Sequence, residues 1–139
     1  MPSKSRENCV MSGKRYLLDT NAIVCLLRGE SALEQRLQSA EWVGISILSQ
    51  IEFLAFPNLN ENDRRIFQEF SDGVEVVGLG RTERALIDRI VSLRAQYRLK
   101  LPDAIIAATA VECDATLITD DHQLRKLSAI RSSSTSASE

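Results

Sequence analysis

The sequence has little of several features that define common classes of protein. Of its 139 residues only three are cysteines and one is histidine. Their spacing argues against a zinc site and against a disulfide framework. No apolar run approaches the roughly 20 residues that a membrane-spanning helix needs. A glycine-rich phosphate loop is also absent, and a single histidine gives little support to a Ser–His–Asp triad.

Charge and cysteine usage bear on compartment and partners. The net charge of −2 gives no general attraction to nucleic acid. An RNA or DNA partner would therefore have to be met by a local basic patch or with the help of a metal ion. The first ten residues are polar and contain no signal-peptide core, and isolated cysteines are typical of a reducing environment. We expect a cytoplasmic protein with no membrane association.

The central part of the chain is predicted to fold as one α/β domain. The hydrophobic share of 44% and the charged share of 26% are ordinary for a globular protein. Between residues 15 and 130, β-branched segments alternate with segments of helical periodicity. This alternation predicts a parallel sheet of four to five strands with helices on both sides. Residues 1–14 are expected to be a flexible extension, with Met11 as a candidate natural start, and the serine-rich residues 131–139 a disordered tail.

Apolar periodicity and turn residues predict the individual elements. Strands are expected at residues 15–20, 42–48, 74–79 and 115–119. Helices are expected at residues 21–29, 31–40, 49–56, 61–73, 81–99 and 120–127, and from Pro102 onward. Ser31 and Glu34 are spaced as a capping box, and Asn60 and Gly73 flank a helix as its caps.

Acidic residues follow the predicted strands. Asp19 ends the first strand, Asp120 and Asp121 end the last, and Glu52 follows the second by one turn. Asp103 opens a helix that is apolar on every face, where an uncompensated charge is costly. Ligands of open α/β sheets bind beyond the carboxyl ends of the strands. We therefore expect four of these acids to meet at one edge of the sheet: Asp19, Glu52, Asp103 and Asp121.

Each acid also has a purely structural explanation. Asp19 and Asp121 fit helix N-caps or turn residues, and Ser49 with Glu52 fits a capping box. The helix dipole favours Asp103 by only about 0.3–1 kcal/mol, which is too little to justify its burial. Four anions at one edge would repel, so a cation is expected among them. Carboxylate oxygens without a histidine or cysteine cluster suit Mg²⁺ or Mn²⁺ rather than zinc.

Three stretches of the chain together resemble the PIN-domain family, and within it the VapC-like ribonuclease toxins of type II toxin–antitoxin pairs. The stretches are LLDTNAIVCLLRG, ISILSQIEFL and KLPDAIIAATAVECDATLITDD, and the resemblance runs from about Tyr16 to Leu127. It implies a parallel sheet between helices, in agreement with the alternation described above.

The resemblance also implies a role for each acid. Asp19 and Asp103 match direct metal ligands, Glu52 matches an acid that lines the site, and Asp121 matches the acid that completes the quartet. Positions that orient these acids or their waters are matched by Asn21, Ser49 and Thr119. Many relatives continue beyond TDD with another acid and then Phe, where this chain has Gln123 and Leu124. Asp120 is a partial substitute, and the choice between Asp120 and Asp121 stays open.

The function that the resemblance implies is Mg²⁺-dependent endoribonuclease cleavage that leaves a 5′-phosphate. In this hypothesis Asp19 and Asp103 ligate the metal, while Glu52 and Asp121 hold water and accept its proton. Lys100 and Arg28 are candidate phosphate contacts, with solvated surface charge as the alternative for each. The arginines of residues 81–98 form either a solvated helix face or an RNA ridge.

Partners and rival functions follow from the same resemblance. A small antitoxin would block the acidic cleft with Arg or Lys, and homodimerisation is typical of the family. The phenylalanines of residues 53–56 and 67–70 would face such a partner or belong to the core. One rival is a catalytically inactive PIN-fold module that binds RNA or protein, which Gln123 weakly favours and the retained acids argue against. A receiver-like phospho-acceptor domain is the other, and it is disfavoured because the acidic pair comes last in the chain.

Overall fold

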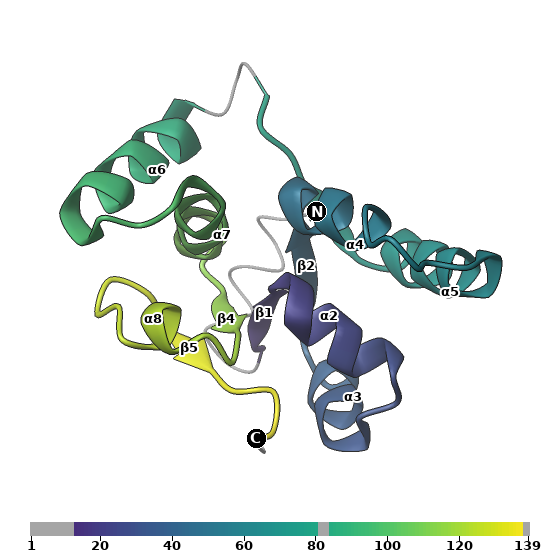
Figure 1. Cartoon of the computed structure of the whole chain (residues 1–139). Coiled ribbons are helices and arrows are strands. Elements are labelled where there is room, and N and C mark those ends of the chain that lie inside the picture. The colour runs from purple at the N-terminus through teal and green to yellow at the C-terminus, as the bar shows by residue number, and fades with distance from the viewer. Residues whose placement is uncertain (1–12, 81–83, 138–139) are drawn as a thin grey trace.

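The computed structural model of the chain describes residues 13–80 and 84–137. Strands and helices alternate along most of it, as predicted (Figure 1). The strands are β1 (Arg15–Leu18), β2 (Trp42–Ser46), β3 (Glu75–Val77), β4 (Thr116–Ile118) and β5 (Ser132–Ser133). The helices are α2 (Thr20–Leu27), α3 (Ser31–Gln38), α4 (Ile47–Leu54), α5 (Glu61–Asp72), α6 (Arg84–Tyr97), α7 (Leu101–Glu112) and α8 (His122–Arg125). Among the described residues, no helix has both the length and the apolar character to cross a bilayer.

The strands form one five-stranded sheet in the order β3-β2-β1-β4-β5. All of its pairings are parallel, and Leu17 in the central strand β1 lies opposite Gly44 of β2 and Leu117 of β4. The predicted fold class, a parallel sheet of four to five strands, is confirmed. Because every strand runs the same way, the segments that follow all of them emerge at one edge of the sheet.

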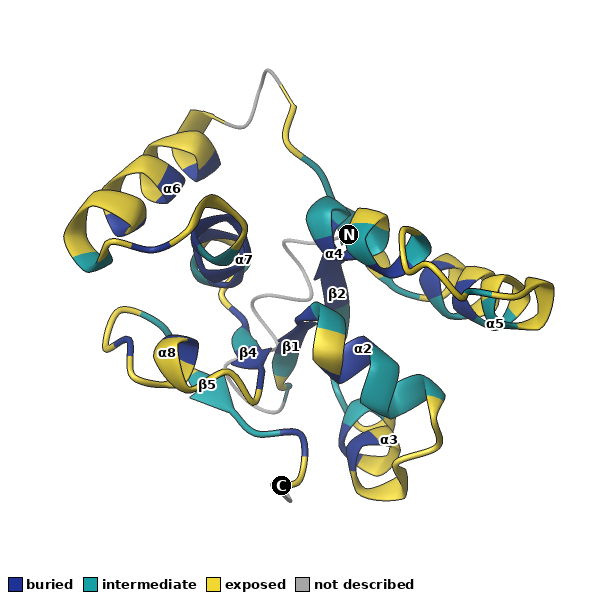
Figure 2. Ribbon diagram, viewed as in Figure 1, coloured by how far each residue is buried: buried dark blue, intermediate teal, exposed yellow. Residues whose placement is uncertain are grey.

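Helices cover both faces of the sheet, and the two-residue period of the strands assigns side chains to each face. Leu17 and Leu117 point to the face covered by α6, α7 and α8, with which they form one core cluster. Leu18 and Ile118, their next neighbours in sequence, point to the other face and pack with Phe67 of α5. Figures 1 and 2 show these two layers, with buried residues gathered along the sheet and on the inner sides of the helices.

Helix α7 is buried along most of its length, as its uniformly apolar sequence predicts. Residues 104–110 are all buried, and four of them are alanines that are fully inaccessible: Ala104, Ala107, Ala108 and Ala110. Pro102 stands in the first turn, where its missing N–H costs no hydrogen bond. Asp103 follows in the same turn, so the buried helix carries a carboxylate at the end nearest the carboxyl edge of the sheet.

Of the two predictions about the ends of the domain, the one about the C-terminal tail needs correction. The expectation of a disordered tail over residues 131–139 is wrong for residues 131–137, because Ser132 and Ser133 form strand β5 beside β4. The ordered domain therefore extends past the predicted boundary at residue 130. The flexible extension at residues 1–14 and the start at Met11 lie almost entirely outside the described residues. Within them, the backbone oxygen of Lys14 already accepts a hydrogen bond from Glu41 N at 2.8 Å.

The capping signals had mixed outcomes. The capping box predicted for Ser31 and Glu34 is wrong, because α3 begins one residue earlier than that motif requires and Glu30 is its N-cap. Asn60 and Gly73 do cap α5, and Asp63 completes a capping box with Asn60. The predicted helix over residues 81–99 is observed from Arg84 to Tyr97, and residues 81–83 lie outside the described residues.

Candidate active site

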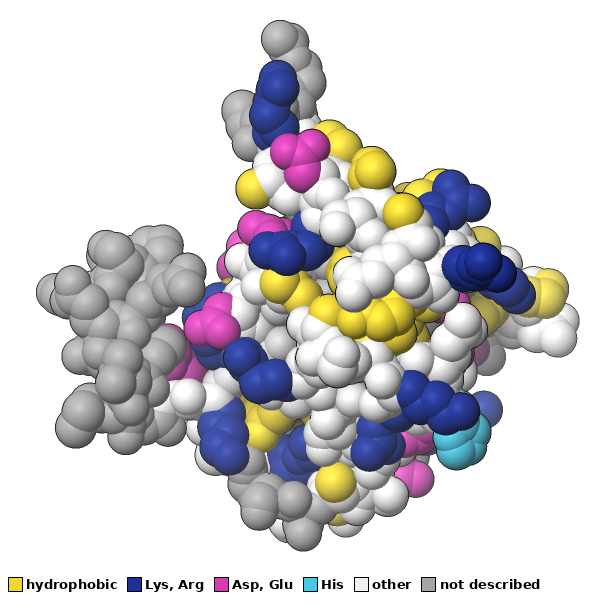
Figure 3. Space-filling model, turned by 90° about the vertical axis from the view of Figure 1, so that its left-hand side faces the viewer, with side chains coloured by type: hydrophobic (Ala, Val, Ile, Leu, Met, Phe, Trp, Pro, Cys, Tyr) yellow, Lys and Arg dark blue, Asp and Glu magenta, His cyan; other side chains and the backbone are white. Residues whose placement is uncertain are grey.

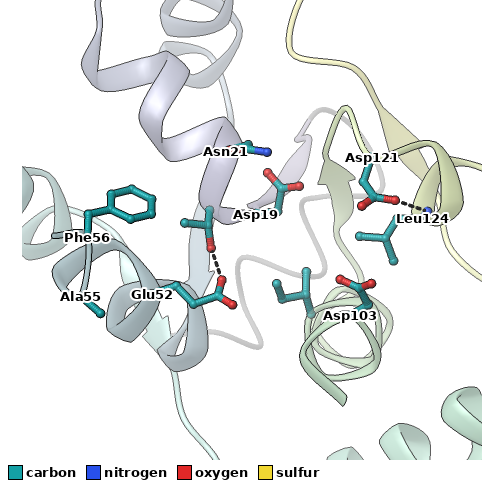
Figure 4. A pocket seen from close by; sticks show the side chains of 10 residues that line it. Asp19, Asn21, Glu52, Ala55, Phe56, Asp103, Asp121 and Leu124 are labelled. Carbon is teal, nitrogen blue, oxygen red and sulfur yellow. Dashed lines mark hydrogen bonds between the residues drawn. The ribbon is translucent and has the colours of Figure 1, made fainter. Parts of the chain in front are cut away.

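Acidic side chains from four separate elements line one pocket at the carboxyl edge of the sheet. Asp19 follows β1, Glu52 belongs to α4, Asp103 to α7, and Asp121 lies between β4 and α8, and Figure 4 shows their carboxylates around a common space. The pocket has a volume of about 470 Å³. Its other lining residues are Thr20, Asn21, Ala55, Phe56, Ile106 and Leu124. The predicted quartet is thus brought together, and no described lysine or arginine lines the pocket with it.

Asp19 is the most buried acid of the pocket. Only 7% of its surface is accessible, and its Oδ1 accepts a hydrogen bond from Ala22 N at 2.8 Å as the N-cap of α2. The capping explanation is therefore correct, yet it occupies only part of the carboxylate. Burial raises the pKa of Asp19, and a hydrogen bond with Thr119 and that from Ala22 oppose the rise. Burial therefore destabilises the charged form of Asp19, and the two hydrogen bonds offset part of that cost.

Asp103 is half-buried and faces the other acids. Burial raises its pKa, and the neighbouring charges of Asp121 and Glu52 raise it further. The charge of Lys100, at the N-cap of the same helix, opposes these effects. Asp103 therefore lies within electrostatic reach of Asp121 and Glu52, as Asp19 does of Asp121.

Glu52 is held by a residue that sequence reasoning missed. Its Oε1 accepts a hydrogen bond of 2.6 Å from Thr20 Oγ1, across from α2 to α4. The capping-box explanation for Glu52 is wrong, because Ser46 is the N-cap of α4 and its hydroxyl accepts from Leu48 N. The only available signal for Thr20 was its position directly after Asp19, at the first residue of a helix that starts in the pocket.

The structure separates the two adjacent acids after β4. Asp121 lines the pocket and also caps α8, where its Oδ1 accepts from Leu124 N at 3.1 Å. Asp120 does not line the pocket, because its carboxylate turns to Thr135 and accepts hydrogen bonds from Thr135 N and Oγ1. These bonds lower the pKa of Asp120. The partial substitution expected of Asp120 is therefore not seen.

The supporting polar residues differ in their placement. Asn21 lies at the exposed rim, and Thr119 is buried behind the pocket, where its Oγ1 accepts from Asp121 N at 3.0 Å. Ser49 is fully buried in α4, does not line the pocket, and its hydroxyl makes no hydrogen bond with a described residue. The role expected for Ser49 in orienting the acids is therefore not visible in the structure.

The two candidate phosphate contacts also differ. Lys100 is exposed beside Asp103 at the start of α7. Arg28 is exposed at the C-cap of α2, which is the opposite end of that helix from Asp19. An eight-residue helix is about 12 Å long, so Arg28 is not brought to the pocket.

The donor chemistry of the pocket fits a divalent cation. Its ionisable groups are four carboxylates, and hard oxygen ligands are those that Mg²⁺ and Mn²⁺ prefer. The raised pKa of Asp19 and of Asp103 shows that this pocket disfavours uncompensated negative charge, which a cation would offset. Among the described residues, no three acidic, histidine or cysteine side chains already form a ligand cluster. The carboxylates would therefore have to move closer together to ligate one ion.

Fold and site together define a class of protein. It is a single parallel α/β domain with a pocket of carboxylates at the carboxyl edge of its sheet. Within that class the chain belongs to the PIN domain family, whose model matches residues 16–130. The family resemblance carried by the three sequence stretches is therefore confirmed. No curated protein matches the chain.

Solved structures with the same fold include several toxin–antitoxin complexes. A toxin–antitoxin complex from Klebsiella pneumoniae is 27% identical, covers 86% of this chain and 97% of its own, and has a TM-score of 0.68. VapBC-1 from nontypeable Haemophilus influenzae is 20% identical, with coverages of 88% and 99% and a TM-score of 0.73. VapBC2 from Rickettsia felis, bound to a DNA fragment from its promoter, is 18% identical, with coverages of 86% and 98% and a TM-score of 0.72. The last two show the fold alone.

Proposed function

We propose that this protein is a metal-dependent endoribonuclease and the toxin of a toxin–antitoxin pair. The observation that carries the proposal is the pocket itself, in which acids from four elements converge without a lysine or arginine in the described lining. Membership of the PIN family and the 27% identity to a chain of a toxin–antitoxin complex support it. A cytoplasmic location is part of the same proposal.

The acids of the pocket divide into two proposed roles. Asp19 and Asp103 would hold Mg²⁺ or Mn²⁺, because burial and neighbouring acids raise the pKa of both and a cation would offset the cost of their negative charge. When bound, such an ion supplies Lewis-acid chemistry for phosphodiester hydrolysis, polarising phosphate and water. Asp121 is more exposed and would orient the attacking water and accept its proton. Glu52 would share that task, and Thr20 holds its carboxylate toward the pocket.

The outer surface of the molecule on the side of α6, α7 and α8 supports a nucleic-acid substrate. Exposed basic side chains are spread over this face, which Figure 3 shows. They include Arg84, Arg89, Arg94, Arg98, Lys100, Arg125 and Lys126. Arg89 is partly neutralised by Glu112, at 3.0 Å, whereas Lys100 at the N-cap of α7 lies close enough to Asp103 for its charge to lower the pKa of that acid. Basic residues beside an acidic site would bind the phosphates that flank the cleaved bond.

An antitoxin is the second partner in the proposal. A groove of about 520 Å³ lies between α2, α3 and α5, lined by apolar residues such as Leu26, Leu37 and Phe70 and by the polar residues Glu34, Gln38 and Glu41. A small antitoxin would cover this groove and place an Arg or Lys in the acidic pocket. Of the four phenylalanines, Phe53 and Phe67 stack in the core at 4.5 Å, which leaves Phe56 and Phe70 at surfaces. Homodimerisation remains a prediction.

The test is a cleavage assay with matched variants. Wild-type protein is incubated with total RNA in the presence of Mg²⁺, Mn²⁺ or EDTA, and product ends are tested for a 5′-phosphate. Asp19→Asn and Asp103→Asn should lower the rate by about 100-fold or more, since each removes a carboxylate on which metal chemistry depends. Asp88→Asn is the control, because Asp88 is an exposed acid of α6 outside the pocket.

Three outcomes would contradict the proposal. Undiminished cleavage by Asp19→Asn would rule out the site, and cleavage in EDTA would rule out metal dependence. If the wild-type protein binds RNA but no metal supports cleavage, the inactive PIN-fold binding module is the correct alternative. A circular dichroism spectrum of each variant shows whether a lost rate reflects chemistry rather than a lost fold.

A further inference from the structure

The serine-rich end of the described chain is held tightly against the domain. We call residues 132–137 the tail strap. Ser132 and Ser133 pair with β4 as strand β5, and the backbone oxygen of Ser133 accepts a hydrogen bond from Thr119 N at 2.9 Å. Thr135 is buried. A segment whose composition is typical of disorder is therefore fixed by specific contacts, which raises the question of what those contacts do.

Arg36 of α3 anchors the tail strap at its far side. Only 5% of Arg36 is accessible, although arginine is rarely buried without partners. Its Nη1 donates to Ser134 O at 2.8 Å and to Ala137 O at 3.1 Å, and its Nη2 donates to Ser133 Oγ at 3.0 Å. The guanidinium also lies 5.3 Å from the centre of the Tyr16 ring. These contacts offset the cost of burying the charge and tie the strap to the helical layer on that side.

The tail strap is hydrogen-bonded to the segment that carries Asp121, one of the acids of the pocket. Thr135 N and Oγ1 donate to the two carboxylate oxygens of Asp120 at 2.9 and 2.7 Å. On the pocket side of the same segment, Thr119 Oγ1 accepts from Asp121 N and hydrogen-bonds to Asp19. Residues 119 and 120 are thus hydrogen-bonded to the tail strap, whereas the side chain of residue 121 points away from the strap into the pocket.

We propose that Arg36 and Thr135 are positioning residues of the candidate active site, acting through the tail strap to hold Asp120 outward and Asp121 in the pocket. The inference rests on the proposed function for its meaning, but the contacts exist independently of it. Without the strap, β4 becomes an edge strand, Thr119 N loses its acceptor and Asp120 loses both donors. Two adjacent acids would then compete for one pocket.

Conservative variants test this assignment. Thr135→Val keeps the shape of the side chain and removes the hydroxyl donor to Asp120, and Thr135→Ser restores the donor. Arg36→Met removes the anchor, and Arg131→Met is its control because Arg131 is an exposed arginine whose partner is Asp114. Two properties are measured: backbone amide hydrogen exchange at Thr119 and Asp121, and Mn²⁺ binding by calorimetry. Neither requires that RNA is cleaved.

We expect Thr135→Val to raise amide exchange at Thr119 and Asp121 and to weaken Mn²⁺ binding, each by about 10-fold. The amide of Leu93, a buried residue of α6 that makes no contact with the tail strap in the hydrogen bonds described above, is the control and should keep its wild-type rate. Thr135→Ser and Arg131→Met should behave as wild type, whereas Arg36→Met should resemble Thr135→Val. If Arg36→Met fails to fold, Thr135→Val and Thr135→Ser still test whether the tail strap positions Asp121.

Wild-type exchange at both amides in Thr135→Val would overturn the inference. So would a failure of Thr135→Ser to restore it, since the hydroxyl would then not be the cause. A wild-type protein that cuts no RNA would refute the proposed function alone, because the exchange measurement would still report whether the tail strap holds Asp121.

Discussion

Asp19 serves two purposes that conflict energetically. Its Oδ1 caps α2 through Ala22 N, which stabilises the fold, while burial of its charge destabilises the fold in the absence of a compensating cation. An asparagine at the same position would keep an oxygen able to accept from Ala22 N and would carry no charge. The two contributions can therefore be separated by one substitution.

We predict that Asp19→Asn raises the metal-free stability of the protein. The gain should be about 1 kcal/mol, which corresponds to a rise in Tm of about 2–4 °C for a domain of this size. Thermal unfolding in EDTA, followed by circular dichroism, measures it. Asp88→Asn provides the control for loss of an exposed charge. A lower Tm for Asp19→Asn would show that the cap, and not the buried charge, dominates at this residue.

The same raised pKa values predict how stability depends on pH. A carboxyl group whose pKa is above its usual value of 3.8 contributes stability below that pH and loses it as pH rises through the raised folded-state pKa. In EDTA the wild-type protein should therefore lose stability relative to Asp19→Asn as pH rises from about 4 to neutral. Asp120 has a lowered pKa and acts in the opposite sense, below pH 3.8, outside this window. A difference in Tm that does not change with pH would contradict the assignment.

At the scale of elements, α7 links the core to the pocket. Its alanines allow it to pack against the sheet, and its first turn presents Asp103. Ala107 is fully buried, and its neighbours leave no accessible surface at that position. Extra volume there must displace either α7 or the sheet, because close-packed interiors do not absorb an added side chain.

We predict that Ala107→Leu lowers the free energy of unfolding by about 1–3 kcal/mol. Chemical denaturation measures this directly. Ala95→Leu is the control, since Ala95 is exposed on α6 and should change stability by no more than about 0.5 kcal/mol. Equal effects of the two substitutions would show that α7 is loosely packed. Asp103 lies one helical turn away, so the folded Ala107→Leu protein should also cleave RNA more slowly.

The elements themselves were largely predictable, because the pattern of apolar residues records which face is buried. β5 was not, since two serines carry no such pattern and the strand exists only through its pairing with β4. Local spacing alone also misled: Ser31 and Glu34 match a capping box, yet Glu30 is the N-cap. The burial of Arg36 carries no local signal either, because its acceptors come from a segment almost 100 residues later in the chain.

At the scale of the whole molecule, the pocket is a product of topology. Parallel strands bring the segments after β1 and β4 to one edge, so the meeting of Asp19 and Asp121 could be predicted from the sequence. The direction of individual side chains could not. Asp120 and Asp121 are adjacent and chemically identical, and they are told apart only by contacts distant in the sequence or set by the local fold: Asp120 binds Thr135, whereas Asp121 caps α8. The bond from Thr20 to Glu52 likewise depends on how α2 and α4 pack.

Because the pocket joins elements from both helical layers to the sheet, metal binding should stabilise the molecule as a whole. Mg²⁺ at a hundred times its dissociation constant adds about 2.7 kcal/mol to the free energy of unfolding, provided that the unfolded chain does not bind it. We predict a rise in Tm with Mg²⁺ that exceeds the rise with NaCl at matched ionic strength, which controls for screening. Asp103→Asn should lose most of the difference. If Mg²⁺ and NaCl act alike on the wild-type protein, the four carboxylates do not hold a cation, and their common pocket would need another explanation.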